Sequence, residues 1–224
     1  MTRQEKTPLL PIVVLVSGSG TNLQVVLDQA ASGELPVDVR AVISNRPGVK
    51  ALERAQAAGV TAQVLDHKQF TSRADYDAAL MNLIDNYQPA LVVLAGFMRI
   101  LSADFVRHYA GRLLNIHPSL LPKYRGLHTH RSALANGDTV HGVSVHFVTE
   151  ELDSGPTVLQ AEVPVLPGDT EDTLTARVQS REYVIYPQVI RWIAEGRLKY
   201  QQGKPMFDGE CLEKPHRLAW NDTL

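Results

Sequence analysis

Short apolar runs alternate with segments of helical periodicity along the first half of the chain, and this alternation limits the fold more than any other feature. Each run is apolar at successive positions, as expected for a strand buried on both faces of a parallel sheet. The clearest helical segments between them are Leu23–Ala30 and Tyr76–Ile84. The runs are Ile12–Val16, Val39–Ser44, Ala62–Leu65, Leu91–Ala95 and Leu113–His117.

The pattern changes in the second half of the chain. Val143–Phe147 alternates between apolar and polar residues, Pro156–Val165 predicts a further strand, and Thr170–Ala194 predicts a long helix. We therefore predict an α/β fold: a doubly wound, mostly parallel sheet with a Rossmann-like N-terminal half, an antiparallel extension and a long C-terminal helix. The predicted organisation is a disordered start over residues 1–10, a single domain over 11–197 and an irregular tail over 198–224.

Composition narrows the class of protein. The net charge is −2 and no basic cluster occurs, which argues against a nucleic-acid partner. A single cysteine, Cys211, excludes an internal disulfide and favours a cytoplasmic setting. No apolar run is long enough to span a membrane, so a membrane partner is not expected. His128 and His130 form an incomplete ligand set, and no metal is predicted.

The fifth run ends in an amide and an imidazole. Alternate side chains of a strand share a face, so Asn115 and His117 are expected to point together beyond the strand end, where Pro118 stops the strand. An amide donor beside a titratable ring can stabilise an oxyanion and move a proton. Taken alone, the pair also fits a turn asparagine and a hydrogen-bonded surface histidine.

A glycine-rich turn, Ser17–Asn22, follows the first run and leads into a helix. Its glycines allow a tight turn, and the free amides of a helix N-terminus attract an anion. Leu23 stands where a dinucleotide fingerprint has its third glycine, and the lysine of a nucleotide-triphosphate loop is missing. The turn therefore fits a phosphomonoester better than a dinucleotide or a nucleoside triphosphate. The alternative is a plain turn with Thr21 or Asn22 as the helix cap.

Apolar side chains follow the fourth run, in Ala95–Leu101. Gly96 permits close approach of the backbone, and such a segment suits a flat aromatic ligand. The Phe97-Met98 pair is also compatible with ordinary core packing. Arg99, placed among apolar residues, favours a ligand site.

Carboxylates are concentrated in the loop Thr149–Gly155, where solvated surface charge is the ordinary interpretation. Leu152 suggests a turn that folds inward and brings Asp153 towards the end of the fifth run. A carboxylate near His117 would favour the charged imidazolium and help it act as an acid at neutral pH.

Together these motifs resemble those of the phosphoribosylglycinamide formyltransferases, the folate-dependent enzymes of purine synthesis, from about Ile12 to Gly196. This resemblance implies 10-formyltetrahydrofolate and glycinamide ribonucleotide (GAR) as small-molecule substrates, no metal, and a monomer or weak homodimer. The blocks that carry it are Val14–Gln24, Leu94–Leu101, Leu114–Pro122, His141–Val148, Asp153–Pro156, Arg177–Gln179, Glu182 and Tyr186–Pro187.

The resemblance also implies roles for individual residues. Asn115, His117 and Asp153 match the catalytic trio of the family. The implied GAR contacts are Gly20, Thr21 and Asn22 for the phosphate, with Gln179 and Glu182 for the glycinamide portion. The implied folate contacts are Arg73, Met98, Arg99, Ile100, Leu101, Asn115, Thr149, Glu150, Glu151, Leu152 and Asp153.

Direct formyl transfer to the amine of GAR is the function that these residues predict. One alternative is another folate-dependent formyltransferase, such as a methionyl-tRNA formyltransferase, which adds an RNA-binding domain that is not expected here. Another is a formyltetrahydrofolate hydrolase, which uses water as the acceptor. A non-catalytic sensor of phosphate ligands would explain the glycine-rich turn but would leave Asn115, His117 and Asp153 without a shared purpose.

Overall fold

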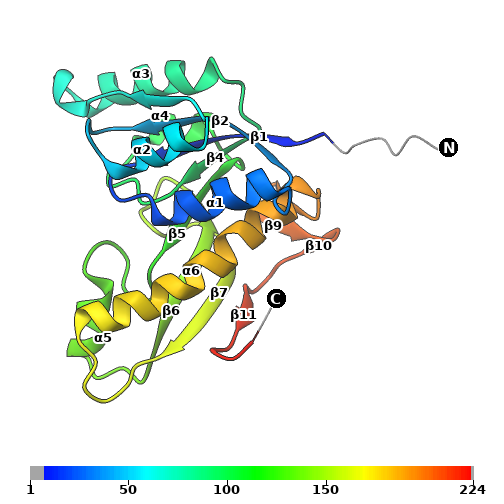
Figure 1. Ribbon diagram of the computed structural model, residues 1–224. Coiled ribbons are helices and arrows are strands. Elements are labelled where there is room, and N and C mark those ends of the chain that lie inside the picture. The colour runs from blue at the N-terminus through cyan, green and yellow to red at the C-terminus, as the bar shows by residue number, and fades with distance from the viewer. Residues whose placement is uncertain (1–7, 223–224) are drawn as a thin grey trace.

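The computed structural model describes residues 8–222, and within them the centre of the molecule is an eight-stranded sheet (Figure 1). The strand order is β11-β7-β6-β5-β4-β1-β2-β3. Its strands are β1 Leu10–Val16, β2 Val37–Ser44, β3 Ala62–Val64, β4 Leu91–Leu94, β5 Leu113–His117, β6 Val140–Phe147, β7 Thr157–Pro164 and β11 His216–Leu218. The helices are α1 Thr21–Ser32, α2 Lys50–Ala57, the 3-10 turn η1 His67–Gln69, α3 Arg73–Asp85, α4 Ala103–His108, α5 Thr129–Ala135 and α6 Glu171–Ala194.

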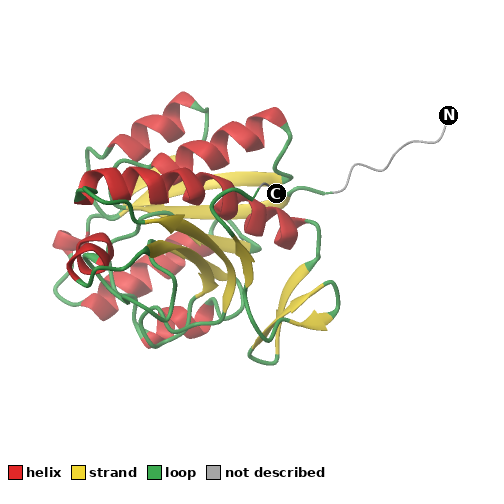
Figure 2. Ribbon diagram, turned by 90° about the horizontal axis from the view of Figure 1, so that it is seen from below, coloured by secondary structure: helices red, strands yellow, loops and turns green. Residues whose placement is uncertain are grey.

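Helices cover both faces of the sheet, as Figure 2 shows. Alternate residues of β1 supply the two sides: Val14 belongs to the apolar cluster that includes α1 and α6, while Val13 belongs to the cluster that includes α3 and α4. A strand covered on both faces must be apolar at every position. This is why the first half of the sequence shows continuous apolar runs.

The sheet is mostly parallel and its antiparallel part is where the sequence predicts it. Strands β1, β2, β3, β4 and β5 pair in parallel, whereas β6 pairs antiparallel with β5 and with β7. The long helix α6 begins one residue after Thr170, whose hydroxyl accepts a hydrogen bond from the Thr173 N–H as part of a capping box. The predicted fold class is confirmed.

The prediction of an irregular tail is wrong. After α6 the chain forms a three-stranded antiparallel sheet of β8 Leu198–Gln201, β9 Lys204–Phe207 and β10 Glu210–Cys211, and β11 then pairs in parallel with β7. Trp192 of α6, Phe207 and His216 pack as an aromatic group with ring centroids 4.7–5.5 Å apart. These strands are too short to show a hydrophobic period, and tertiary packing decides their conformation.

The first strand begins at Leu10, so it includes the last residue of the predicted disordered start. Residues 1–7 of that prediction lie outside the described residues. Helices α2 and α4 were not predicted, because eight and six residues are too few for a clear helical period. No helix in the described part of the chain has the length and apolar character needed to cross a bilayer.

Candidate active site

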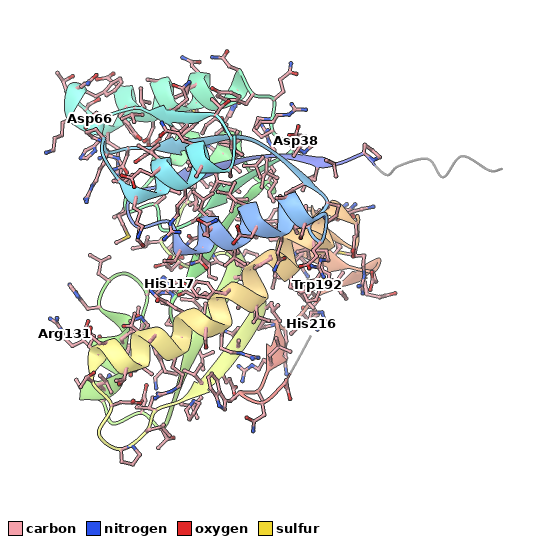
Figure 3. The ribbon with its side chains drawn as sticks, in the orientation of Figure 1. Asp38, Asp66, His117, Arg131, Trp192 and His216 are labelled. Carbon is pink, nitrogen blue, oxygen red and sulfur yellow. The ribbon has the colours of Figure 1, made fainter. Side chains whose placement is uncertain are left out.

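The carboxyl ends of β1, β4 and β5 lie along one edge of the sheet, because these strands are parallel neighbours. Strand β4 ends at Leu94, which pairs with Asn115, and β5 continues past it to His117. The end of β5 therefore lacks a β4 partner and is open to a ligand. Ligands of open α/β sheets bind at this edge. Figure 3 labels His117 there, below α1 in that view.

His117 is held between two acceptors. Its Nε2–H donates to the Tyr124 carbonyl at 2.8 Å, and its Nδ1 lies 3.5 Å from Asp153 Oδ2. The His117 and Asp153 side chains are 7% and 8% exposed, so water screens their interaction little. Asp153 Oδ2 also accepts the Gly126 N–H at 2.9 Å, which fixes the carboxylate. The inward turn of the loop expected from the sequence therefore does bring Asp153 to His117.

Asn115 is oriented by His146, a residue that the sequence analysis did not assign to the site. His146 lies opposite Asn115 on β6, and its Nδ1–H donates to the Phe147 carbonyl at 3.0 Å. Burial lowers the pKa of His146 to about 4, so its ring is neutral at neutral pH. The free Nε2 then accepts the Asn115 amide at 3.2 Å. The signal for His146 was its place on the polar face of an alternating strand.

At Gly20 both the backbone conformation and the close approach of α2 favour glycine in the glycine-rich turn. This residue has φ of +70°, and a Cβ there would lie 2.7 Å from Ala51 Cβ of α2. Gly20 is the N-cap of α1 and provides no side-chain cap, so the first N–H groups of the helix keep their capacity for an anion. Thr21 and Asn22 are half-buried at the same helix start.

Asn22 contacts a carboxylate that lies far away in sequence. Its Nδ2 donates to Glu182 Oε2 at 2.7 Å, which joins the start of α1 to α6. Burial raises the pKa of Glu182, and the Asn22 hydrogen bond opposes that shift. The Asn22 Oδ1 is buried and has no hydrogen-bond partner among the residues that the structure describes. Gln179 lies half-buried one turn earlier on α6. The structure thus brings Asn22 and Glu182 together and places Gln179 nearby.

The segment after β4 exposes apolar side chains. Met98 and Ile100 are each 57% exposed, which is unusual for large apolar residues and leaves them available to a ligand. Arg99 behaves otherwise: its guanidinium lies 4.6 Å from the centre of the Tyr76 ring of α3. The Arg99 side chain therefore packs on the fold. Leu101 packs against the same apolar cluster as Tyr76, and Arg73 is exposed at the start of α3.

Of the carboxylates in the loop after β6, only Asp153 turns inward. Glu150 pairs with Arg107 at 2.9 Å and Glu151 pairs with Arg125 at 2.8 Å, both on the surface. These two glutamates are therefore solvated surface charges, the ordinary interpretation of such a loop. Thr149 is half-buried and Leu152 is 48% exposed. The loop presents one buried acid and one exposed apolar side chain at the edge where β5 ends.

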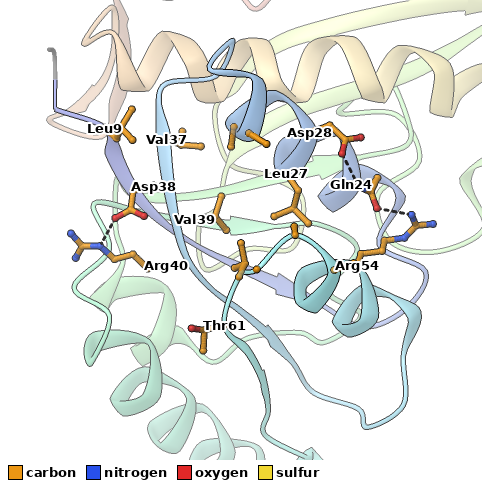
Figure 4. Close-up of a pocket in the computed structure, with 16 residues that line it drawn as sticks. Leu9, Gln24, Leu27, Asp28, Val37, Asp38, Val39, Arg40, Arg54 and Thr61 are labelled. Carbon is orange, nitrogen blue, oxygen red and sulfur yellow. Dashed lines mark hydrogen bonds and ion pairs between the residues drawn. The ribbon is translucent and has the colours of Figure 1, made fainter.

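One hollow lies away from this edge. A cavity of about 670 Å³ lies between α1, β2 and α2, lined by residues such as Leu27 and Val39, with Arg54 bonded to Gln24 at one side (Figure 4). Its charged side chains are bonded to neighbours in the lining: Arg40 donates to Asp38, Arg54 donates to Gln24, and Gln24 donates to Asp28. A smaller hollow of about 310 Å³ reaches Asp153 from the side of the tail. The candidate site is the group of side chains at the ends of β1, β4 and β5.

His130 lies beside another histidine of the fold, His141 of β6. His130 Nδ1 lies 3.2 Å from His141 Nε2, and burial lowers the pKa of both His130 and His141. Among residues 8–222, no group of three or more His, Cys, Asp or Glu side chains could hold a metal ion.

Comparison with known families places this chain in a class of transferases. Residues 10–190 match the family described as Formyl transferase, so the chain belongs to the formyl transferase family. It is 59% identical over 201 residues to the phosphoribosylglycinamide formyltransferase of Escherichia coli, covering 90% of this chain and 95% of that protein. The Haemophilus influenzae enzyme of the same name is 45% identical, covering 91% and 96%.

Solved structures show the same relationship. The phosphoribosylglycinamide formyltransferase of Coxiella burnetii superposes with a TM-score of 0.89 at 51% identity, covering 94% of this chain and 99% of that one. At such identity and coverage, the likeness extends through the fold and past the end of α6 into the tail.

Proposed function

We propose that this chain transfers the formyl group of 10-formyltetrahydrofolate to the amine of GAR, giving formyl-GAR and tetrahydrofolate in purine biosynthesis. The observation that carries the proposal is the buried contact of His117 with Asp153, next to the Asn115 amide. High identity to enzymes of this name over nearly their whole length supports the choice of substrates. The proposed setting is the cytoplasm, which the single cysteine favours.

The proposed reaction has two steps. The uncharged amine of GAR attacks the formyl carbon, a C–N bond forms, and the carbonyl electron pair moves to oxygen. Asn115 and protonated His117 stabilise this oxyanion, and each such donor lowers the barrier by about 3 kcal/mol. The bond to the folate nitrogen then breaks, and that nitrogen takes a proton as the amine loses one. Asp153 supports the charged ring of His117 and holds a water that relays the proton.

Acceptors at both ring nitrogens of His117 support this role. A ring that donates from Nε2 to the Tyr124 carbonyl and faces a carboxylate at Nδ1 is best satisfied when it carries protons on both nitrogens. Such a ring can donate to an oxyanion or to a leaving nitrogen only by releasing one of these partners. We infer that substrate binding exchanges the Tyr124 carbonyl for the reacting oxygen.

The proposed substrate positions follow from the same edge of the sheet. The Gly20–Asn22 turn holds the phosphate of GAR, and Glu182, together with Gln179, receives the glycinamide end. The formyl-folate lies along Met98–Leu101 and the Thr149–Asp153 loop, with Arg73 at the outer end. The two substrates then meet at Asn115. For Arg99, we assign the contact to its backbone, since its side chain packs on Tyr76.

The decisive experiment is a formyl-transfer assay with formyl-folate, with and without GAR. Release of tetrahydrofolate only when GAR is present, with formyl-GAR as the product, is the expected result. Release without GAR would instead favour a hydrolase, and binding of GAR without turnover would favour a sensor. Light scattering of the same sample tests the expected monomer or weak homodimer.

Two variants test the site itself. Asn115→Ala and His117→Ala should each reduce turnover by about 100- to 1000-fold while GAR binding survives. His216→Ala, at the start of β11 and away from the ends of β1, β4 and β5, is the histidine control and should retain turnover (Figure 3). Turnover near that of the parent protein in either site variant would contradict the assignment.

A further inference from the structure

A buried chain of hydrogen bonds crosses the ends of three neighbouring strands, outside the group at β5. Ser17 directly follows β1, Asn45 directly follows β2, and Met98 lies beyond the end of β4. In the sheet these strands are adjacent, in the order β4-β1-β2. Ser17 is 3% exposed and Asn45 is 1% exposed, so the hydrogen bonds between them are shielded from water.

The direction of each bond is determined by the groups present. The Met98 backbone N–H donates to Ser17 Oγ at 2.8 Å, and the Ser17 hydroxyl donates to Asn45 Oδ1 at 2.6 Å. A serine hydroxyl has one proton to donate, and here Asn45 receives it. The Ser17 hydroxyl therefore donates to the residue that follows β2 and accepts from the segment that follows β4.

Asn45 is itself anchored. The His67 ring donates from Nδ1 to the Asn45 carbonyl at 2.8 Å, since a carbonyl can only accept. That nitrogen then cannot accept the Asn45 amide, which lies 3.3 Å from it. The side chain of Asn45 is therefore hydrogen-bonded to Ser17. Its backbone is held by His67 of η1.

The Ser17 hydroxyl matters more for the segment after β4 than for the glycine-rich turn. Met98 has its backbone fixed by Ser17 while its side chain is 57% exposed. The turn has anchors of its own: the Ala51 N–H donates to the Gly18 carbonyl at 3.1 Å, and Arg54 donates to the Ser19 carbonyl at 2.9 Å. Loss of the Ser17 hydroxyl should therefore release the Met98 backbone before it disturbs the turn.

We propose that Ser17 is a positioning residue that fixes the backbone of Met98–Leu101 and so sets the affinity for the folate substrate. Asn45 acts through Ser17 by holding its hydroxyl. The inference rests on the proposed function, because it assigns this segment to the folate. It adds a physical link between the two substrate segments, since one serine both begins the phosphate turn and holds the folate side.

The test measures both Michaelis constants in four proteins: the parent, Ser17→Ala, Asn45→Ala and the double variant. Ser17→Ala should raise the KM for formyl-folate roughly tenfold, as expected for one lost buried hydrogen bond, and leave the KM for GAR within about twofold. Asn45→Ala leaves the Ser17 hydroxyl able to accept from Met98, so it should raise the folate KM by only about threefold. The folate KM of the double variant should be no higher than that of Ser17→Ala, because both substitutions act through the contact of Ser17 with Met98.

Ser44→Ala is the matched control. Ser44 is fully buried at the same end of β2, but its hydroxyl donates to the Arg46 carbonyl and does not reach Met98. It should lower the melting temperature without changing the folate KM. Hydrogen exchange of the Met98 amide should be faster than in the parent in Ser17→Ala and unchanged in Ser44→Ala.

The outcomes separate the two proposals. A parent protein that makes no formyl-GAR overturns the proposed function. An active parent with an unchanged folate KM in Ser17→Ala, or with equal rises for both substrates, overturns the role of Ser17. If Ser17→Ala does not fold, the pair Asn45→Ala and Ser44→Ala decides: a rise in folate KM confined to Asn45→Ala supports the role, and equal values contradict it.

Discussion

Acid should destabilise the fold through His146, the buried ring that orients Asn115. Burial lowers its pKa from the ordinary value of 6.5 to about 4, so the folded protein keeps the ring neutral over a range in which the unfolded chain takes up a proton. Because the folded pKa is depressed, the unfolded state binds more protons below pH 6.5. The free energy of unfolding is therefore highest above pH 6.5 and falls as the pH decreases towards 4.

The size of this loss follows from the pH interval. Each pH unit changes the free energy of unfolding by about 1.4 kcal/mol for one proton. Over the interval from 6.5 to about 4 the loss amounts to about 3 kcal/mol. Since the total stability of a domain is about 5–15 kcal/mol, this is a large fraction of it. His141, 2% exposed and with its pKa also lowered to about 4 mainly by burial, should add a comparable loss.

The assay is urea unfolding of the parent and of His146→Gln at a series of pH values from 7.5 to 4. The glutamine is neutral throughout and offers an oxygen to Asn115, so the variant lacks the titration but keeps an acceptor. Loss of packing should make the variant less stable than the parent at pH 7. The difference in free energy of unfolding between the two proteins should then narrow by about 3 kcal/mol as the pH falls to 4.

Comparison with the variant removes the effect of carboxylates, which titrate in both proteins. The difference in free energy of unfolding between the parent and His141→Gln should also narrow as the pH falls. The double variant should show the weakest dependence of its free energy of unfolding on pH. Parallel curves for the parent and His146→Gln between pH 7 and 4 would refute the argument, because they would show that His146 takes up its proton equally in the folded and unfolded states.

Three further substitutions test the framework of the site. Tyr186→Phe removes a fully buried hydroxyl that lies 2.8 Å from the Leu94 carbonyl at the end of β4 and 3.2 Å from the Leu114 carbonyl near the start of β5, and donates to them. The substitution should lower the free energy of unfolding by about 1–2 kcal/mol and the melting temperature by about 2–8 °C in a calorimeter, and an unchanged melting temperature would contradict it. Gly155→Ala would place a Cβ 1.8 Å from the Phe147 carbonyl oxygen, so the loop must move. Displacement of Asp153 should then reduce kcat by up to about 100-fold in the formyl-transfer assay, and a parental kcat would argue against that coupling. Asp153→Asn keeps the shape of the side chain but removes its charge, and should reduce kcat by about 100-fold at neutral pH; full activity would exclude a role for the charge.

The sequence by itself determined which segments of the first half form the sheet strands, the fold class and the strand that carries Asn115 and His117. Strand β5 has the predicted bounds, Leu113–His117. These features depend on local periodicity and on proline breaks, which neighbouring residues encode directly. The motif blocks were also sufficient to indicate the family, because each keeps its residues contiguous.

Only the tertiary structure decided which distant groups meet. Asn22 and Glu182 are 160 positions apart, and their contact exists because α1 and α6 pack on the same face of the sheet. Asp153 reaches His117 through a turn in which its own φ is +49°, a conformation that a non-glycine residue adopts only when its surroundings stabilise it. The strands of the tail likewise form by pairing and packing, since runs of two to four residues have no period to detect. Local pattern specifies the elements, whereas side-chain contacts across the sheet edge, absent from any local pattern, assemble the site.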